Sequence, residues 1–373
     1  MRIIYVNTLY DEFAADVYRA HPRLDRAGFA EQMAFMDSTF FPSGGAWSAA
    51  FRSLGHETMD IDANNGAAQV RWCVENGAEE LLHTCAEEHR FGFYRWPRRQ
   101  PRPWYLPIVA RQVRTFRPDI LILANLYTFD SQFLDEIRGH AGLIVGQHAA
   151  ALPSSDLRGY DLIVSSLPNQ VEHFRSLGLR SELQRLAFDR RMLVALGPPR
   201  ERHHAGFHGQ VSSYHTARIG LLRRVAEAVE LEMWGGGDWG REGPPAGLRR
   251  HPALWGIDLY RKMAETDIVL NCHLDAAGPY ANNLRLYEAT GVGSFLLTDW
   301  KFNLHGLFEI GTEVAAYRDA DDAVRLLQHY REHPEERRAI AEAGQRRTLR
   351  DHTYEHRAAE LIDMLGALFP GRL

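Results

Sequence analysis

Short apolar runs alternate with helix-like segments along the whole chain, and this alternation restricts the possible folds more than any other feature. In the first half the apolar runs are RIIYVNTLY, ETMDID, DILILANL, LIVGQH and DLIVSS. Helix-like segments such as 104–116 and 166–178 lie between them. Near-continuous runs of Ile, Val and Leu separated by helices are typical of a parallel sheet that helices cover on both faces.

A second alternating series follows a polar stretch rich in Pro and Gly at 197–206, which we interpret as a linker or hinge. Its strand-like runs are GFHGQV, LEMWGGG, DIVLNCHL and SFLLTD, and three helical stretches close the chain. A length of 373 residues fits two domains of average size. We therefore predict an α/β protein with two doubly wound, Rossmann-like domains, residues 1–190 and 205–350. Their ligand site should lie at the strand carboxyl ends, in a cleft between the domains.

The composition excludes several classes of function. A net charge of −5 gives no general attraction to nucleic acid or anionic lipid. The three cysteines fit neither a disulfide framework nor a zinc site, which predicts a reducing, cytoplasmic setting. The amino terminus does not read as a signal peptide, and no apolar run approaches membrane-spanning length. The basic, aromatic stretch 95–119 leaves two interpretations open: peripheral contact with an anionic or lipid-linked acceptor, or a solvated loop before an amphipathic helix.

The segment 282–300 (NNLRLYEATGVGSFLLTDW) is the most informative stretch of the chain. It predicts a helix capped by Asn282 or Asn283 and followed by a buried strand. Arg285 falls in the first turn, where a cation opposes the helix dipole unless an anion is bound there. Glu288 lies on the same face and can accept hydrogen bonds from the two hydroxyls of a ribose. This pattern favours a nucleotide diphosphate at the start of the helix.

A plainer interpretation of the same helix stays open. Arg285 and Glu288 are spaced as an ordinary ion pair on a solvated helix face, which is worth a few tenths of a kcal/mol. At the other end, we expect Gly291 to take the left-handed conformation that ends the helix. Gly293 should allow the backbone to pass close to its neighbours.

Residues 205–365 resemble the carboxyl-terminal nucleotide-sugar domain of GT-B glycosyltransferases, and the CgeB-like, glycosyl transferase family 1 type in particular. The resemblance rests on GFHGQVSSYHTARIGLLRRV, on DIVLNCHLDAAGPYANNLRLYEATGVGSFLLTDW and on the segment from NLHGLFEIGTEV to YEHR. It implies a ribose-binding role for Glu288 and a diphosphate near Asn283 and Arg285. It also implies that the first domain binds the acceptor and that helix 351–373 packs back on that domain. No cofactor and no metal are expected.

The resemblance suggests further contacts with the donor, and at one position this sequence departs from the pattern of the family. Tyr280 stands where many retaining enzymes of this fold carry a Glu, eight residues before the ribose Glu. Tyr280 is itself a candidate for the substrate site, and the donor-sugar contacts and the stereochemical class stay open. Arg218 is a candidate for the donor diphosphate, with a solvated helix position as the alternative. Gly209 would let the backbone approach the ligand.

The first domain offers weaker candidates. Gly44 and Gly45 resemble the glycine loop of these enzymes and should precede a helix that starts near Ala46, although a plain turn is the alternative. His148 ends a predicted strand and is our first candidate for a catalytic base or a sugar contact, against a purely structural role.

Other acidic residues compete with His148 for a chemical role. Asp11, Glu12 and Asp130 stay open as candidates. The D-x-D patterns at 59–62 and 319–321 are discounted as metal sites, because the first ends a strand and the second precedes a helix that Asp can cap.

We therefore predict a metal-independent glycosyltransferase that moves a sugar from a nucleotide diphosphate-sugar to a hydroxyl of a glycan, lipid-linked or small-molecule acceptor. The setting would be polysaccharide or glycoconjugate biosynthesis. A non-catalytic nucleotide-sugar-binding protein is the alternative from another class, and an epimerase or phosphorylase of the same fold is the enzymatic alternative.

Overall fold

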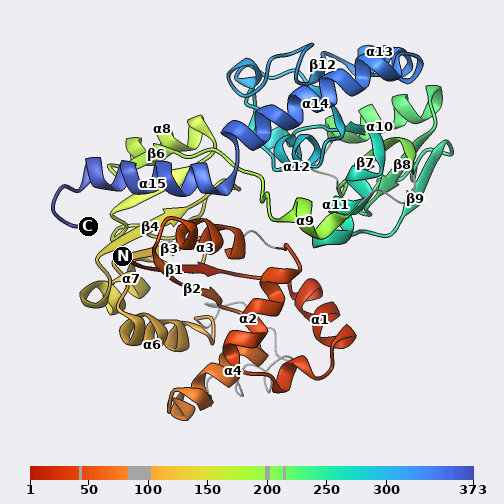
Figure 1. The fold of residues 1–373 in the computed structure, drawn as a ribbon. Helices are drawn as coiled ribbons and strands as arrows, with labels where there is room; N and C mark the ends of the chain where they lie inside the picture. The colour runs from red at the N-terminus through yellow and green to blue at the C-terminus, as the bar shows by residue number, and fades with distance from the viewer. Residues whose placement is uncertain (42–43, 83–101, 198–201, 213–215) are drawn as a thin grey trace. The chain divides into compact units, whose positions relative to one another are not determined.

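The computed structural model describes residues 1–41, 44–82, 102–197, 202–212 and 216–373. The chain divides into two compact units. Unit 1 comprises Met1–Gln184 and Ala358–Leu373, and unit 2 comprises Arg185–Arg357. Each unit contains one six-stranded parallel sheet with helices against it (Figure 1). This architecture confirms the predicted fold class of two doubly wound, Rossmann-like units.

The sheet of unit 1 has the strand order β2-β1-β3-β4-β5-β6. Its central strands are buried on both faces. Ile4 pairs with Leu121 and Val6 with Leu123, and all four side chains are fully buried. Each contributes about 1.5–3 kcal/mol by leaving water. The strands are β1 (Arg2–Asn7), β2 (Glu57–Asp62), β3 (Ile120–Leu123), β4 (Leu143–Gln147), β5 (Leu162–Ser165) and β6 (Ser181–Leu183).

Helices from both ends of the chain complete unit 1. The last helix, α15 (Tyr354–Leu368), lies by β6 and α8 (Figure 1). Arg180 donates to the carbonyl of Leu368, and Arg372 forms an ion pair with Asp161 at 3.0 Å. The other helices are α1 (Asp11–Ala20), α2 (Phe29–Ser38), α3 (Gly44–Ser53), α4 (Gly66–Glu75), α6 (Leu106–Phe116), α7 (Ser131–Ile137) and α8 (Pro168–Ser176).

The sheet of unit 2 repeats this plan with the order β12-β11-β10-β7-β8-β9. The strands are β7 (His203–His208), β8 (Leu231–Trp234), β9 (Leu248–His251), β10 (Thr266–Leu270), β11 (Phe295–Asp299) and β12 (Ala315–Tyr317). The helices are α9 (Met192–Leu196), α10 (Thr216–Ala228), α11 (Gly256–Ala264), α12 (Arg285–Gly291), α13 (Ala320–Glu332) and α14 (Pro334–Asp351). After β7 the chain adds β8 and then β9 on one side of this strand, and it then adds β10, β11 and β12 on the other side. The carboxyl ends of β7 and β10 are therefore the topological switch point of this unit.

Three strands at the edges of the sheets are not predicted from the sequence. β6, β9 and β12 have only three or four residues each, and β9 carries two exposed arginines at its centre. Other strands of four residues, such as β3 and β5, are recognisable because they lie inside continuous apolar runs, and the sequence around β6, β9 and β12 has no such run.

Candidate functional site

Arg285 and Glu288 form a buried ion pair beside the switch point of unit 2. Both lie on α12, and the Arg285 guanidinium approaches the Glu288 carboxylate to 2.6 Å. Their side chains are only 14% and 9% exposed, so this is not the solvated surface pair of the plainer interpretation. The second guanidinium nitrogen donates to the carbonyl of His208, at the end of β7, at 2.9 Å. The pair thus joins α12 to the first strand of the sheet.

Tyr260 of α11 completes this cluster and is not recognisable from the sequence. Its hydroxyl donates to the free oxygen of the Glu288 carboxylate at 2.8 Å. Burial, together with the negative charge of Glu288, raises the pKa of Tyr260 well above its ordinary value. Tyr260 therefore stays a neutral donor, and both Glu288 oxygens are held in fixed positions.

The start of α12 differs from the prediction. The helix begins at Arg285 rather than at 282, and the side-chain oxygen of Asn283 accepts a hydrogen bond from the N–H of Leu286 at 3.3 Å. Asn283 also exchanges side-chain hydrogen bonds with Asn271, directly after β10. The residue directly before the helix is Leu284, which makes no side-chain capping bond, so Asn283 supports the first turn from one residue earlier, and Asn282 lies half-buried before it.

The two glycines after α12 have the opposite roles to those expected. Gly293, not Gly291, has a positive φ, of 84°. A Cβ at Gly291 would lie 2.5 Å from ring atoms of Phe188, so this glycine is required for close packing. The sequence shows that both residues are glycines but does not show that a distant phenylalanine packs against one of them.

Arg218 lies inside unit 2 and ties two loops together. Its guanidinium donates to the carbonyl of Gln210 at 2.7 Å and to that of Cys272 at 2.9 Å. These carbonyls follow β7 and β10, so Arg218 spans the switch point. Burial lowers the pKa of Arg218 from its ordinary value. The side chain is 8% exposed, which contradicts the alternative of a solvated helix position.

A glycine-rich turn holds the backbone around Gly209. The carbonyl of Gly209 would lie 1.9 Å from a Cβ at Gly235, and that of Val211 would lie 1.8 Å from a Cβ at Gly237. Val211 and Gly237 also pair as an isolated parallel bridge. The segment 209–211 is thus fixed by backbone contacts that only glycine permits. Gly209 itself is half-buried beyond the end of β7.

Two further residues at the strand ends of unit 2, a histidine and an aspartate, are not predicted from the sequence. His273 Nδ1 lies 2.6 Å from the Asp299 carboxylate, and the His273 side chain is fully buried. Asp299 is the last residue of β11 and His273 lies three residues beyond β10, so both lie at strand carboxyl ends, and that position is the signal that could have identified them. Tyr280, by contrast, lies half-buried in the loop before α12, and the hydrogen bonds described for the Arg285–Glu288 pair do not involve it.

In unit 1, Gly44 and Gly45 lie within the first turn of α3, because the helix begins at Gly44 and not near Ala46. A Cβ at Gly45 would lie 1.8 Å from a carboxylate oxygen of Asp37. Residues 42 and 43 of the expected loop lie outside the described residues. The close approach of Asp37 places a carboxylate beside the amino-terminal end of α3, where negative charge is favourable.

His148 follows β4 and is 5% exposed. Its Nε2 donates to the carbonyl of Ala151 at 2.9 Å, and its ring packs edge-on against Tyr127 and Phe174. Burial lowers the pKa of His148 from its ordinary value. The side chain is therefore a neutral imidazole at pH 7, as a general base must be.

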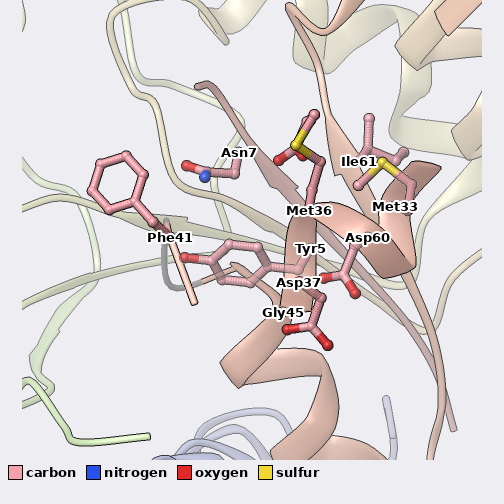
Figure 2. Close-up of a pocket in the computed structure, with 10 residues that line it drawn as sticks. Tyr5, Asn7, Met33, Met36, Asp37, Phe41, Gly45, Asp60 and Ile61 are labelled. Carbon is pink, nitrogen blue, oxygen red and sulfur yellow. The ribbon is translucent and has the colours of Figure 1, made fainter. Parts of the chain in front are cut away.

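A small pocket lies in unit 1 at the carboxyl ends of β1 and β2 (Figure 2). Asp60 and Asp62 of the D-x-D pattern at 59–62 both line it, as do Asp37 and Gly45.

The other D-x-D pattern, at 319–321, behaves as predicted, since Asp319 caps α13 by accepting from the N–H of Asp322. Asp130 likewise caps α7 through the N–H of Phe133.

Among the described residues, no group of three or more His, Cys, Asp or Glu side chains could hold a metal ion. In the same part of the chain, no helix is long and apolar enough to cross a membrane. Residues 95–101 of the basic, aromatic stretch lie outside the described residues.

Comparison with known proteins agrees with this architecture. Residues 218–363 match the model of a family described as glycosyl transferase-like. The chain is similar to HepE from Anabaena, solved in complex with UDP-glucose, with a TM-score of 0.58, 12% identity and coverage of 98% of this chain and 100% of that chain. No curated protein matches the sequence significantly.

Two further solved structures share the fold over nearly their whole length. Sucrose-phosphate synthase from Thermosynechococcus elongatus has a TM-score of 0.58 at 11% identity, with 99% of both chains covered. A glycosyltransferase from Rickettsia africae has a TM-score of 0.59 at 9% identity, again with 99% of both covered. At these identities the likeness concerns the fold, and it confirms the predicted GT-B type.

Proposed function

We propose that this GT-B glycosyltransferase moves a sugar from a nucleotide diphosphate-sugar to an acceptor hydroxyl without the help of a metal ion. The observation that carries the proposal is the buried cluster of Arg285, Glu288 and Tyr260 at the switch point of unit 2. It lies inside the segment that matches the glycosyl transferase-like family model. A buried carboxylate with both oxygens positioned is a suitable acceptor for two vicinal hydroxyls.

Glu288 would bind the ribose of the donor. Each of its oxygens accepts one hydrogen bond from the protein, and each keeps a lone pair for a ribose hydroxyl. Hydrogen bonds to an ionised carboxylate are about twice as strong as neutral ones, which suits a contact that anchors the nucleotide.

The donor diphosphate would lie at the start of α12. The N–H groups of Leu284 and Arg285 have no acceptor in the described part of the chain, and Leu284 is exposed. The guanidinium of Arg285 adds positive charge beside them. Such a group of N–H donors and a cation can stabilise the negative charge that develops on the departing diphosphate, which is the task that a metal ion performs in other enzymes.

Unit 1 would bind the acceptor, and its residue for proton transfer would be His148. A neutral imidazole can take the proton of the attacking hydroxyl as the bond to the sugar forms. Because Nε2 donates to Ala151, the remaining lone pair for this task is on Nδ1. We place the enzyme in the cytoplasm, in polysaccharide or glycoconjugate synthesis.

The test is a panel of nucleotide diphosphates and their sugars in a thermal-unfolding assay of the full chain. UDP and UDP-glucose come first, because the similar HepE structure contains UDP-glucose. A ligand at 100 times its dissociation constant stabilises the native state by about 2.7 kcal/mol, which raises the melting temperature by several degrees. We expect Glu288→Ala to abolish that rise.

Glu335→Ala is the matched control. Glu335 also forms an ion pair with an arginine three residues away, Arg338, but both side chains lie on the exposed face of α14. The nucleotide response should survive in this variant. A full response in Glu288→Ala would contradict the ribose assignment.

Product analysis then separates the proposed reaction from its alternatives. Incubation with the stabilising donor should release the nucleoside diphosphate, and the sugar should appear on an acceptor or in water. A binding protein would release nothing, an epimerase would return a changed donor, and a phosphorylase would need inorganic phosphate.

A further inference from the structure

The pocket of unit 1 is built from polar side chains on two paired strands. Tyr5 of β1 lies in register with Asp60 of β2, and Asn7 with Asp62. All four residues line the pocket, because side chains two apart on a strand point to the same face. Figure 2 shows Asp60 and Asp37 with their carboxylates in this region.

Asp62 is the unusual member of this group. It is 7% exposed, and its carboxylate has no hydrogen-bond partner in the described part of the chain. A buried carboxylate without a partner is costly, and in proteins such groups are normally bonded or paired. Burial, with the negative charges of Asp60 and Asp37, raises the pKa of Asp62 to about 7. The folded protein therefore keeps an unfavourable arrangement that a bound cation would relieve.

The neighbouring carboxylates are held in place from outside the pocket. Ser48 donates to Asp60 at 2.6 Å, which fixes its orientation. Asp37 lies against Gly45 at the start of α3, where the helix dipole stabilises its negative charge. Asp62 is thus the carboxylate of this group that meets a ligand without a hydrogen-bond partner in the described part of the chain, and Asp60 lies next to it on the same strand face.

The remaining wall of the pocket is apolar. Met33, Met36, Phe41 and Ile61 line it. Apolar walls exclude water and strengthen the attraction between a carboxylate and a cation. The same walls would pack against the carbon atoms of an organic ligand, whereas a hydrated metal ion gains nothing from them.

We infer that this pocket binds the ammonium group of an acceptor that carries an amine, such as an amino sugar or an amino alcohol. The inference rests on the proposed function, because the ligand is taken to be the acceptor of the glycosyl transfer. An ammonium has three donors and no acceptor, so it can bond Asp60 and Asp62 at once and give the buried Asp62 carboxylate a partner. A neutral hydroxyl offers one donor and leaves the excess negative charge in place.

The experiment compares amines with hydroxyl compounds of the same shape. Glucosamine is paired with glucose, and ethanolamine with ethylene glycol. Calorimetric titration of each into the full chain at pH 7, where both amines are mainly ammonium ions, gives the dissociation constants. In at least one pair we expect the amine to bind 10-fold or more tightly than its hydroxyl partner, and Asp62→Asn and Asp60→Asn each to remove that preference.

Glu172→Gln is the control, because Glu172 is an exposed carboxylate on α8 of the same unit. It should retain the full preference for amines. Circular dichroism of each variant verifies that it is folded, and the nearly isosteric Asp→Asn exchanges keep the shape of the pocket.

Three results would overturn the inference. The first is equal binding of amine and hydroxyl compound in both pairs. The second is an amine preference that persists in either aspartate variant. The third is tight binding of magnesium or calcium ions that the aspartate variants lose, without any amine preference.

The failure of this inference can be distinguished from failure of the proposed function. The amine titrations need no nucleotide, and the thermal response to nucleotides is measured on the same preparation. A protein that responds to UDP-glucose through Glu288 but shows no amine preference keeps its proposed donor and loses only this acceptor class.

Discussion

The guanidinium of Arg285 lies 2.6 Å from the carboxylate of Glu288, and the two side chains are 14% and 9% exposed. An i, i+3 pair of this kind is usually a minor feature of a helix surface. Here burial changes its energetics, because each charge has lost its water and depends on the other. The pair therefore contributes to the stability of unit 2 as well as to the proposed ribose site.

Arg285→Ala should destabilise the unliganded protein by about 3 kcal/mol, because it leaves the Glu288 carboxylate buried with Tyr260 as its one remaining partner in the cluster. Arg338→Ala, which removes an exposed pair of the same spacing, should cost no more than about 0.5 kcal/mol. Urea titration of both variants gives the two free energies of unfolding. Equal losses would show that burial of the Arg285 pair has no energetic consequence.

Gly291→Ala should destabilise the protein by about 1–3 kcal/mol, since the new methyl group would lie 2.5 Å from the ring of Phe188. Adding Phe188→Leu should restore part of the loss by making room. Gly220→Ala in α10 is the control, because a Cβ there meets nothing within 4 Å, and it should stabilise by up to about 1 kcal/mol. Thermal unfolding of the four proteins tests this prediction, and an undiminished loss in the double variant would contradict it.

Asp62 should make the protein less stable as the pH rises. Its pKa is about 7 in the folded state against 3.8 in the unfolded chain, so the folded state holds the proton more tightly between these values. The free energy of unfolding then falls across this window by about 1.4 kcal/mol for each pH unit, up to about 4 kcal/mol above pH 7. Below pH 4 both states are protonated and the penalty is absent.

Asp62→Asn cannot ionise and should lack this penalty. The variant should match the wild type in stability near pH 4 and exceed it at pH 8. Urea titrations of both proteins at several pH values provide the measurement. A difference between them that does not change with pH would show that Asp62 keeps an ordinary pKa.

The pH profile of the turnover rate should identify the role of His148. Burial lowers its pKa below the ordinary 6.5, so the imidazole is neutral at pH 7 and becomes protonated only in more acidic solution. A base must be neutral, so kcat should be level above pH 7 and fall as the pH drops through the lowered value. His148→Gln should lose most of the activity, and the activity that remains should no longer show this fall of kcat, the acidic limb of the profile. Persistence of the limb in the variant would assign the proton transfer to another residue.

The sheet architecture follows from the sequence because buried parallel strands need continuous apolar runs. Runs such as DILILANL and DIVLNCHL are long enough to be recognised, and each became a central strand. β6, β9 and β12 are three or four residues long and do not carry such a run. Apolar pattern thus predicts the middle of a sheet better than its edges.

The candidate site was predictable where its parts are close in sequence. Arg285 and Glu288 lie three residues apart, so helical geometry alone brings them together. Tyr260 and Phe188 come from distant segments, and only the tertiary fold brings them to Glu288 and Gly291. Asp60 and Asp62 lie two residues apart on β2, so both side chains lie on one face of the strand. Their burial depends on packing against α2 and α3, and no local sequence pattern predicts that packing.

The contacts of Gly235 and Gly237 with the carbonyls of Gly209 and Val211 have a consequence for engineering. Backbone lies against backbone there, so a side chain at Gly235 or Gly237 would require the 209–211 loop to move. Libraries intended to alter donor selectivity should therefore exchange 209–212 and 235–237 as one cassette from a single parent, since chimaeras that mix the two would misfold at this junction.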